Sequence, residues 1–290
     1  MTTGKRLSVV ASLVFATCAH GQNVWLPGAG EWIIAPGYTH QFFDEFWLGK
    51  QKTDLPAKIV QQTGYIASEY GITAKLALDG AIGYTRVSFD PPGASFHRAG
   101  LDDSRIGLRY RVLEENQNQH RGVPAVALRV GAIIAGDYDV PSTLPPLNPG
   151  DKASGGEVSL MIGKHLTPGG LGVYSEVGYR NRNHGVPDDL AGTVGLFQHW
   201  HSVTFTGAYR HEQGLSGPDI LGPGFGTTYG FPQVKEISRS IEGAISFTDP
   251  GGRSYQITVA KTLSGRNTGD KWIFGFNASF PLRFHSRTHE

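Results

Sequence analysis

Cysteine and charge are both scarce in this 290-residue sequence. It has one cysteine, 18% charged residues and a net charge of +1. A single cysteine leaves no partner for an intramolecular disulfide. Charges of both signs are scattered along the chain, without the basic stripe that nucleic-acid binding needs and without an acidic tail. Nucleic acid is therefore excluded as a partner.

Long apolar runs are also missing. No stretch approaches the 18 residues of a membrane-spanning helix, so a chain that crosses a membrane must do so with strands. Hydrophobic residues make up 39% of the sequence and the mean hydropathy is −0.23, while glycine and proline are abundant at 40 and 17 residues. That is little apolar material for a large soluble core. It is enough for a β-barrel with an apolar outer face and a polar interior.

The N-terminus has the order of a secretory signal. Lys5 and Arg6 precede a mostly apolar run at 7–19, and small residues follow. The run has about 13 residues where a membrane anchor needs about 20. We expect cleavage after Ala19 or Gly21, with 1–21 as the signal peptide. Cys18 then leaves with it, although a lipoprotein signal is an alternative despite the Thr before that Cys.

The sequence near the C-terminus predicts a long strand. From Trp272 to Phe284 every even position is apolar or aromatic, and the odd positions are mostly small or polar. A period of two with one apolar face is the pattern of a strand. Its length exceeds the 5 to 6 residues typical of soluble sheets and suits a tilted strand across a bilayer. Because proline donates no ladder hydrogen bond, we expect the strand to end near Phe280, before Pro281.

The same alternation recurs along the chain and predicts an all-β fold, a transmembrane antiparallel β-barrel of about twelve strands. Loops are expected at 49–56 and 88–103, the barrel at 22–284 and a polar tail at 285–290. Connections after even strands are mostly short and those after odd strands mostly long, as in barrels with short periplasmic turns and long extracellular loops. A soluble β-sandwich or propeller is the alternative, but it predicts no such alternation. The expected strands are 32–42, 58–68, 75–84, 105–112, 126–134, 157–162, 171–180, 191–200, 203–210, 236–247, 254–263 and 272–280.

If the apolar faces meet lipid, the opposite faces line the lumen and carry charges of both signs. These charges could tune which solute passes through a water-filled lumen, or they could pair across strands and fill a narrow interior. A twelve-stranded barrel lies between the filled eight-stranded kind and open porins, so both interpretations stand. The candidate lumen-lining residues are Lys75, Asp79, Arg105, Arg109, Arg111, Arg129, Glu157, Glu176, Arg180, Arg210, Glu236 and Glu242.

Catalytic and metal motifs are weak. His199 and His201 flank Trp200, but two imidazoles without a third ligand fall short of a metal site, and we expect them in a solvated interfacial turn. In outer-membrane phospholipase and deacylase barrels the base and the nucleophile lie two residues apart on a strand, whereas His211 and Ser216 are five apart. We therefore expect no enzyme activity, no metal and no cofactor.

Three short motifs resemble one family. They are Glu69-Tyr-Gly-Ile-Thr73 before an apolar strand, Ile106-Gly-Leu-Arg-Tyr-Arg111 after an Asp-rich loop, and Gly265-Arg-Asn-Thr-Gly269 before the last strand. Together they resemble the outer-membrane barrels associated with the meta-pathway of phenol degradation, a family of transporter-like proteins. The resemblance implies uptake of small, hydrophobic or aromatic compounds and brings no catalytic residues.

The expected location is the cell outer membrane. The expected partners are outer-membrane lipid, a small solute and the barrel-assembly machinery. The leading hypothesis is a passive channel or uptake barrel. The alternatives are a non-conducting barrel that acts as a scaffold or adhesin, and a barrel lipid hydrolase.

Overall fold

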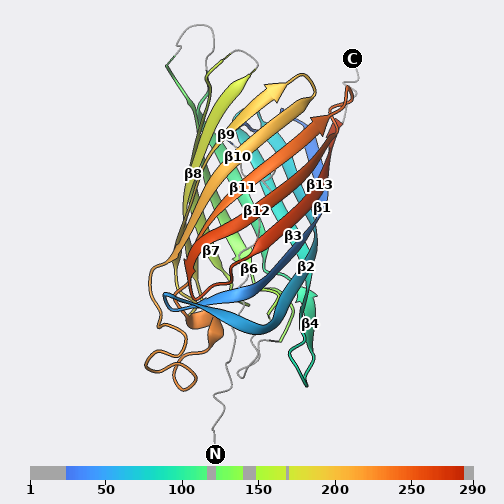
Figure 1. The fold of residues 1–290 in the computed structure, drawn as a ribbon. Coiled ribbons are helices and arrows are strands. Elements are labelled where there is room, and N and C mark those ends of the chain that lie inside the picture. The colour runs from blue at the N-terminus through green and yellow to red at the C-terminus, as the bar shows by residue number, and fades with distance from the viewer. Residues whose placement is uncertain (1–23, 116–121, 140–147, 168–169, 284–290) are drawn as a thin grey trace, which may run out of the picture.

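Alternation of apolar and polar residues through most of the chain produces long antiparallel strands (Figure 1). The computed structural model describes residues 24–115, 122–139, 148–167 and 170–283. Within them, no helix has the length and apolar character needed to cross a bilayer. The strands are β1 (Glu31–Leu48), β2 (Gln51–Thr73), β3 (Leu76–Phe89), β4 (Phe96–Leu101), β5 (Ser104–Leu113), β6 (Ala125–Ile134), β7 (Gly155–His165), β8 (Leu171–Arg182), β9 (Asp189–Trp200), β10 (Val203–Gly214), β11 (Ile237–Thr248), β12 (Ser254–Arg266) and β13 (Trp272–Arg283), with a short 3₁₀ helix η1 (Phe231–Gln233) between β10 and β11.

The strands close into a barrel of twelve positions. β1 pairs with both β13 and β2, and the neighbours continue in chain order around the barrel. β4 and β5 pair with the two halves of β3 and together fill one position, broken at Asp102 and Asp103. Closure satisfies the backbone groups of every strand position, which a bilayer requires. The predicted twelve-stranded antiparallel barrel is confirmed.

The outer face of the barrel is apolar. Its exposed side chains include Val130 at 65%, Ile257 at 63%, and Trp272, Phe274 and Phe276 on β13. Such a surface is unfavourable in water and suits lipid. The predicted apolar face of the last strand is thus confirmed, and the alternating residues of the strands point into the barrel.

The two ends of the barrel differ. One end, here called the turn end, carries the short connections at 74–75, 166–170, 201–202 and 249–253, together with the start of β1 and the end of β13. The other, the loop end, carries the long connections at 135–154 and 215–236 (Figure 1). Four connections depart from the predicted alternation: 49–50, 183–188 and 267–271 are short at the loop end, and 114–124 is long at the turn end.

Two predicted loops are largely strand. β2 covers 51–56 and pairs there with the end of β1, and Pro56 lies where their register shifts, so it interrupts no ladder bond. The predicted loop 88–103 contains β4, which pairs with β3 from Phe89 to Tyr84. Its proline pair, Pro91 and Pro92, is confined to the hairpin tip at 90–95.

The predicted end of the last strand near Phe280 is wrong. β13 continues to Arg283, and Pro281 lies opposite Ile33 of β1. On its other side β12 begins at Ser254, opposite Ser279, so Pro281 lies beyond the end of that neighbour. A missing N–H is tolerated there because only one side needs a ladder partner. The predicted signal peptide 1–21 and tail 285–290 lie outside the described residues.

Candidate functional site

Most of the predicted lumen residues lie on the inner face of the barrel. Asp79, Arg109, Arg129, Glu157, Arg180 and Glu242 are buried there, and Arg105, Glu176 and Arg210 are half-buried. Three predictions need correction. Lys75 lies exposed in the β2–β3 turn, Arg111 lies at the turn-end rim beside Glu114, and Glu236 precedes β11 at the loop end.

Ion pairs connect the inner faces of β2, β3, β5, β6 and β7. Arg129 lies between Asp79, with Nη2 at 2.8 Å from Oδ1, and Glu157. Arg109 bridges the same Asp79, at 3.2 Å from Nε to Oδ2, and Glu69. Both guanidinium groups are fully buried, so removing either one would take from a buried carboxylate, Glu69 or Glu157, its closest cation.

Two glycines make room for Arg129. A Cβ at Gly107 would lie 2.6 Å from its guanidinium carbon, and a Cβ at Gly131 would lie 2.9 Å from Nη1. Real Cβ atoms do not approach so closely, so the arginine occupies the space that side chains on β5 and β6 would otherwise fill. Part of the interior is therefore filled by paired charges, as one of the two interpretations from sequence expected.

A second set of pairs continues around the wall. Arg180 on β8 contacts Asp189 at 2.6 Å and also pairs with Glu212 on β10. Arg182 pairs with Asp189, and Arg210 lies 3.1 Å from Glu242 on β11. The remaining arc of the wall carries neutral groups, for example the Asn277 amide that donates to Gln256 at 2.9 Å. The interior therefore has a charged side and a neutral side.

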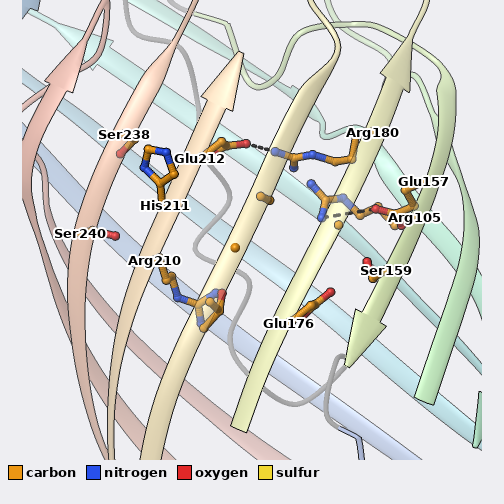
Figure 2. Close-up of a pocket in the computed structure, with 14 residues that line it drawn as sticks. Arg105, Glu157, Ser159, Glu176, Arg180, Arg210, His211, Glu212, Ser238 and Ser240 are labelled. Carbon is orange, nitrogen blue, oxygen red and sulfur yellow. Dashed lines mark ion pairs between the residues drawn. The ribbon is translucent and has the colours of Figure 1, made fainter. Parts of the chain in front are cut away.

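A cavity remains between these groups, lined by residues in the parts of β7–β11 nearer the loop end (Figure 2). Its volume is about 90 Å³, and a single water needs about 10–15 Å³ on the same measure. Its charged lining consists of three arginines and three glutamates, and Ser159, Ser238 and Ser240 add hydroxyls. The cavity therefore has room for several waters. The charged residues of the lining are Arg105, Arg180, Arg210, Glu157, Glu176 and Glu212.

A segment before β1 crosses the interior at the turn end. Val24 is buried against Ala125, Ala127 and Met161 of β6 and β7. Four residues later, the Gly28 carbonyl oxygen lies 2.0 Å from where a Cβ at Gly71 of β2 would stand, so only glycine fits on that wall. Residues 24–30 therefore reach from one wall to the other and are called the inner segment below.

Aromatic rings hold the inner segment. The Trp25 ring lies 5.0 Å from the ring of His165 and 5.5 Å from that of Phe197, at centroid distances typical of aromatic pairs. Glu115 accepts a hydrogen bond from the His165 backbone at 2.7 Å and contacts its Nδ1 at 2.8 Å. The turn end is thus narrowed by a packed cluster.

Apolar side chains cover the interior at the loop end. Phe43, Phe46, Ile59, Val87 and Phe89 point inward from β1, β2 and β3. The loop 215–236 packs Ile220, Phe231 and Val234 onto them. Apolar residues are unexpected on the polar face of a membrane barrel. Together these residues form what we call the loop-end cap.

Hydrogen bonds anchor the loop 215–236 to its neighbours. Arg266 Nε donates to Asp219 at 2.6 Å, and Asn267 Nδ2 donates to the same carboxylate at 3.0 Å. The Asn267 amide oxygen accepts from the backbone of Gly49 and Ile220. The Arg266 guanidinium holds the pKa of the Asp219 carboxyl below its usual value. Asp219 and Asn267 thus join the loop 215–236 to the β1–β2 connection and to the β12–β13 connection.

Acidification is expected to loosen this loop. Because the folded pKa of Asp219 is lowered, its contribution is present above the unfolded pKa of about 3.9 and is lost as the pH falls through the folded value. The pair is partly exposed, so the expected effect is about 0.2–1 kcal/mol, or up to about a fivefold change in loop opening.

Hydrogen–deuterium exchange of residues 215–236, corrected for intrinsic rates, measures that opening. D219N should give faster exchange already at neutral pH, and D249N at the turn end serves as the matched control. Equal protection of the loop in wild type and D219N would contradict the anchoring role.

The histidine motifs take other positions. His199 Nδ1 lies 2.7 Å from Thr204 Oγ1, and its ring lies tilted against that of Phe197 at a centroid distance of 5.0 Å. His199 is therefore only partly in the solvated turn that we expected. His201 is exposed in the turn with φ of +57°. His211 Nε2 lies 3.3 Å from Gln213 Oε1, and Ser216 is exposed in the loop 215–236. Among the described residues, no cluster of three metal-ligating side chains occurs.

Sequence reasoning missed the inner segment, the loop-end cap and the Asp219 anchor. The signals were faint: Trp25-Leu26 follow the expected signal peptide, and Phe231 and Val234 stand in a loop otherwise rich in glycine and proline. Apolar residues in an expected polar loop indicate burial, but they do not indicate against what.

Comparison with known proteins supports the fold. No family model and no curated protein matches the sequence. Among solved structures, an outer-membrane channel from Pseudomonas putida F1 is similar over 89% of this chain and 97% of that one, with a TM-score of 0.71 and 13% identity. The fold is that of an outer-membrane β-barrel.

Two other solved structures are more distantly similar. The translocator domain of the autotransporter NalP from Neisseria meningitidis has a TM-score of 0.47 and 11% identity, over 89% of this chain and 90% of that one. The KdgM porin has a TM-score of 0.47 and 10% identity, over 87% and 99%. The closed barrel and its apolar outer face place the chain in the outer membrane.

Proposed function

We propose that the protein is a passive outer-membrane channel for small solutes. The observation that carries this proposal is the charge-lined cavity inside a closed barrel, which has room for several waters between paired arginines and glutamates. Ion pairs rather than packed apolar side chains surround it, so the interior between the two covered ends offers a polar space to a small solute. The barrel of the similar Pseudomonas putida channel supports the same architecture.

The proposed solutes are small hydrophobic or aromatic compounds. The loop-end cap supports this, because Phe43, Phe46 and Phe231 offer apolar contact on the inner side of the extracellular mouth. When the loop 215–236 moves, a solute with an aromatic ring would form with these rings the contacts that they now form with one another. The resemblance to barrels associated with the meta-pathway of phenol degradation points to the same solute class.

Planar-bilayer recording of the purified, folded barrel tests the channel. We expect discrete single-channel steps, and swelling of liposomes that contain the protein when a small permeant solute is added outside. Heat-modifiable migration on gels verifies that the barrel is folded. A folded barrel that never conducts and leaves liposomes impermeable would defeat the proposal.

A non-conducting scaffold is the second candidate. The scaffold is favoured because both ends of the barrel are covered, the turn end by the inner segment and the loop end by the loop-end cap. The bilayer recording separates the two functions. A scaffold stays silent even when the inner segment is removed, whereas a channel conducts more.

A further inference from the structure

Charges on the inner wall are not balanced. The cluster that runs from β2 to β11 contains six arginines and eight carboxylates, an excess of two negative charges. At the loop end, Lys271 faces Glu236 at 3.8 Å and leaves that excess unchanged. The arginines are Arg105, Arg109, Arg129, Arg180, Arg182 and Arg210, and the carboxylates are Glu69, Asp79, Asp151, Glu157, Glu176, Asp189, Glu212 and Glu242.

Glu176 differs from the other carboxylates of the cavity. Glu157 pairs with Arg129 and Glu212 pairs with Arg180. For Glu176 the described part of the chain gives no ion pair. The Ser159 hydroxyl on β7 and, from beyond ion-pair distance, the charges of Arg129 and Arg210 act on its carboxylate.

The position of Glu176 exposes it to a passing solute. It lies on β8 opposite Met161 and Thr193, is half-buried and lines the cavity (Figure 2). In the same view, Arg180 and Arg105 are drawn toward Glu212 and Glu157. The field of each paired charge is reduced by a partner at contact distance, whereas Arg129 and Arg210 act on Glu176 from farther away, so more of its field extends into the cavity.

From this we propose that the lumen admits small cations in preference to anions, and that Glu176 is the main residue that sets the preference. Among the proposed small solutes, organic amines, aromatic ones included, would then pass more readily than acids, and monovalent inorganic cations more readily than anions. This inference rests on the proposed channel function and adds its charge selectivity. The physical basis is that of acidic side chains in cation channels, where a carboxylate in a narrow passage stabilises the cation and repels the anion.

The reversal potential in a KCl gradient across a planar bilayer tests the inference. Wild type should show a potential of the sign that K⁺ permeation gives. In E176Q, which keeps the shape and removes the charge, the ratio of K⁺ to Cl⁻ permeability should fall by about twofold or more. E176D should stay close to wild type, and E176K should move the potential toward the Cl⁻ side.

A matched control is D54N, because Asp54 is exposed on β2 with its side chain off the inner face. It removes the same charge without touching the cavity and should leave the reversal potential unchanged. Gel migration verifies that each variant is folded. An E176Q barrel that conducts less but has the wild-type reversal potential would assign Glu176 a structural role and overturn the inference.

The two proposals fail in different ways. Absence of any conductance in wild type defeats the channel itself. Conductance with a reversal potential of zero, or of the anion sign, keeps the channel and overturns the cation preference. Retention of the wild-type potential in E176Q refutes the role of Glu176 directly.

Discussion

Replacement of Arg129 with methionine is expected to lower the free energy of unfolding of the barrel by about 3–5 kcal/mol. Arg129 is 1% exposed and lies between Asp79 and Glu157. Methionine removes the cation that both carboxylates share, which leaves Asp79 with Arg109 alone and Glu157 with Arg105 at 4.0 Å. A buried carboxylate that loses its main cation costs far more than a surface pair contributes, which makes this one of the two largest effects expected in this protein.

Urea unfolding in detergent or lipid, followed by gel migration or tryptophan fluorescence, measures the loss. R98M serves as the control, because Arg98 is exposed on β4 and should change stability by about 0.5 kcal/mol or less. The double variant R129M/E157Q should recover part of the loss, since it removes the charge of one of the two carboxylates that lost their shared cation. Wild-type stability in R129M would show that water or rearranged partners compensate for the missing cation.

Removal of the inner segment, residues 24–30, is expected to raise single-channel conductance, by about twofold or more. Its backbone crosses the interior between β6–β7 and β2, so its absence widens the turn end. The measurement is the size of single-channel steps at fixed voltage and salt. Unchanged conductance in a folded barrel would mean that the narrowest part of the path lies elsewhere.

A substitution on the wall tests the same segment without deleting it. A Cβ at Gly163 would lie 2.5 Å from Val24 Cγ1 and 2.7 Å from the Trp25 ring, so G163A should displace the segment and shift conductance in the same direction. G64A is the control, because a Cβ there meets no atom within 4 Å. If G163A reproduced the control while the deletion raised conductance, the segment would be able to adjust within its site.

The strand pattern was readable from the sequence because period-2 alternation is a local property. Lipid outside and a polar interior impose it on every strand of a membrane barrel. Trp272, Phe274 and Phe276 therefore identified the outer face of β13 before any partner was known. The same local reasoning placed Arg109, Arg129 and Arg180 on the inner face.

Local reasoning failed where a neighbour changed the outcome. Pro281 was expected to end β13, but its missing N–H falls beyond the end of β12. The prolines of the expected loop 88–103 restrict only the hairpin tip, and β3 extends the pairing into β4. Lys75 matched the alternation of its strand but falls in a turn, one residue outside the ladder.

The last strand shows what the sequence pattern determines and what only the tertiary structure determines. Its alternation and length predicted a strand with one lipid-facing side, and the same alternation in the other strands together with the signal sequence predicted the membrane barrel. Pairing of β13 with β1, which closes the barrel, is a contact between residues about 240 positions apart in the chain, and no local pattern encodes it.

Tertiary structure alone decided which inner charges are paired. Arg129 meets Asp79 and Glu157 because β3, β5, β6 and β7 lie side by side in a fixed register, whereas Glu176 forms no ion pair within 4 Å among the described residues. A sequence places a charge on a face, since that depends on parity along one strand. Its partners depend on register between strands, which closure of the whole barrel sets.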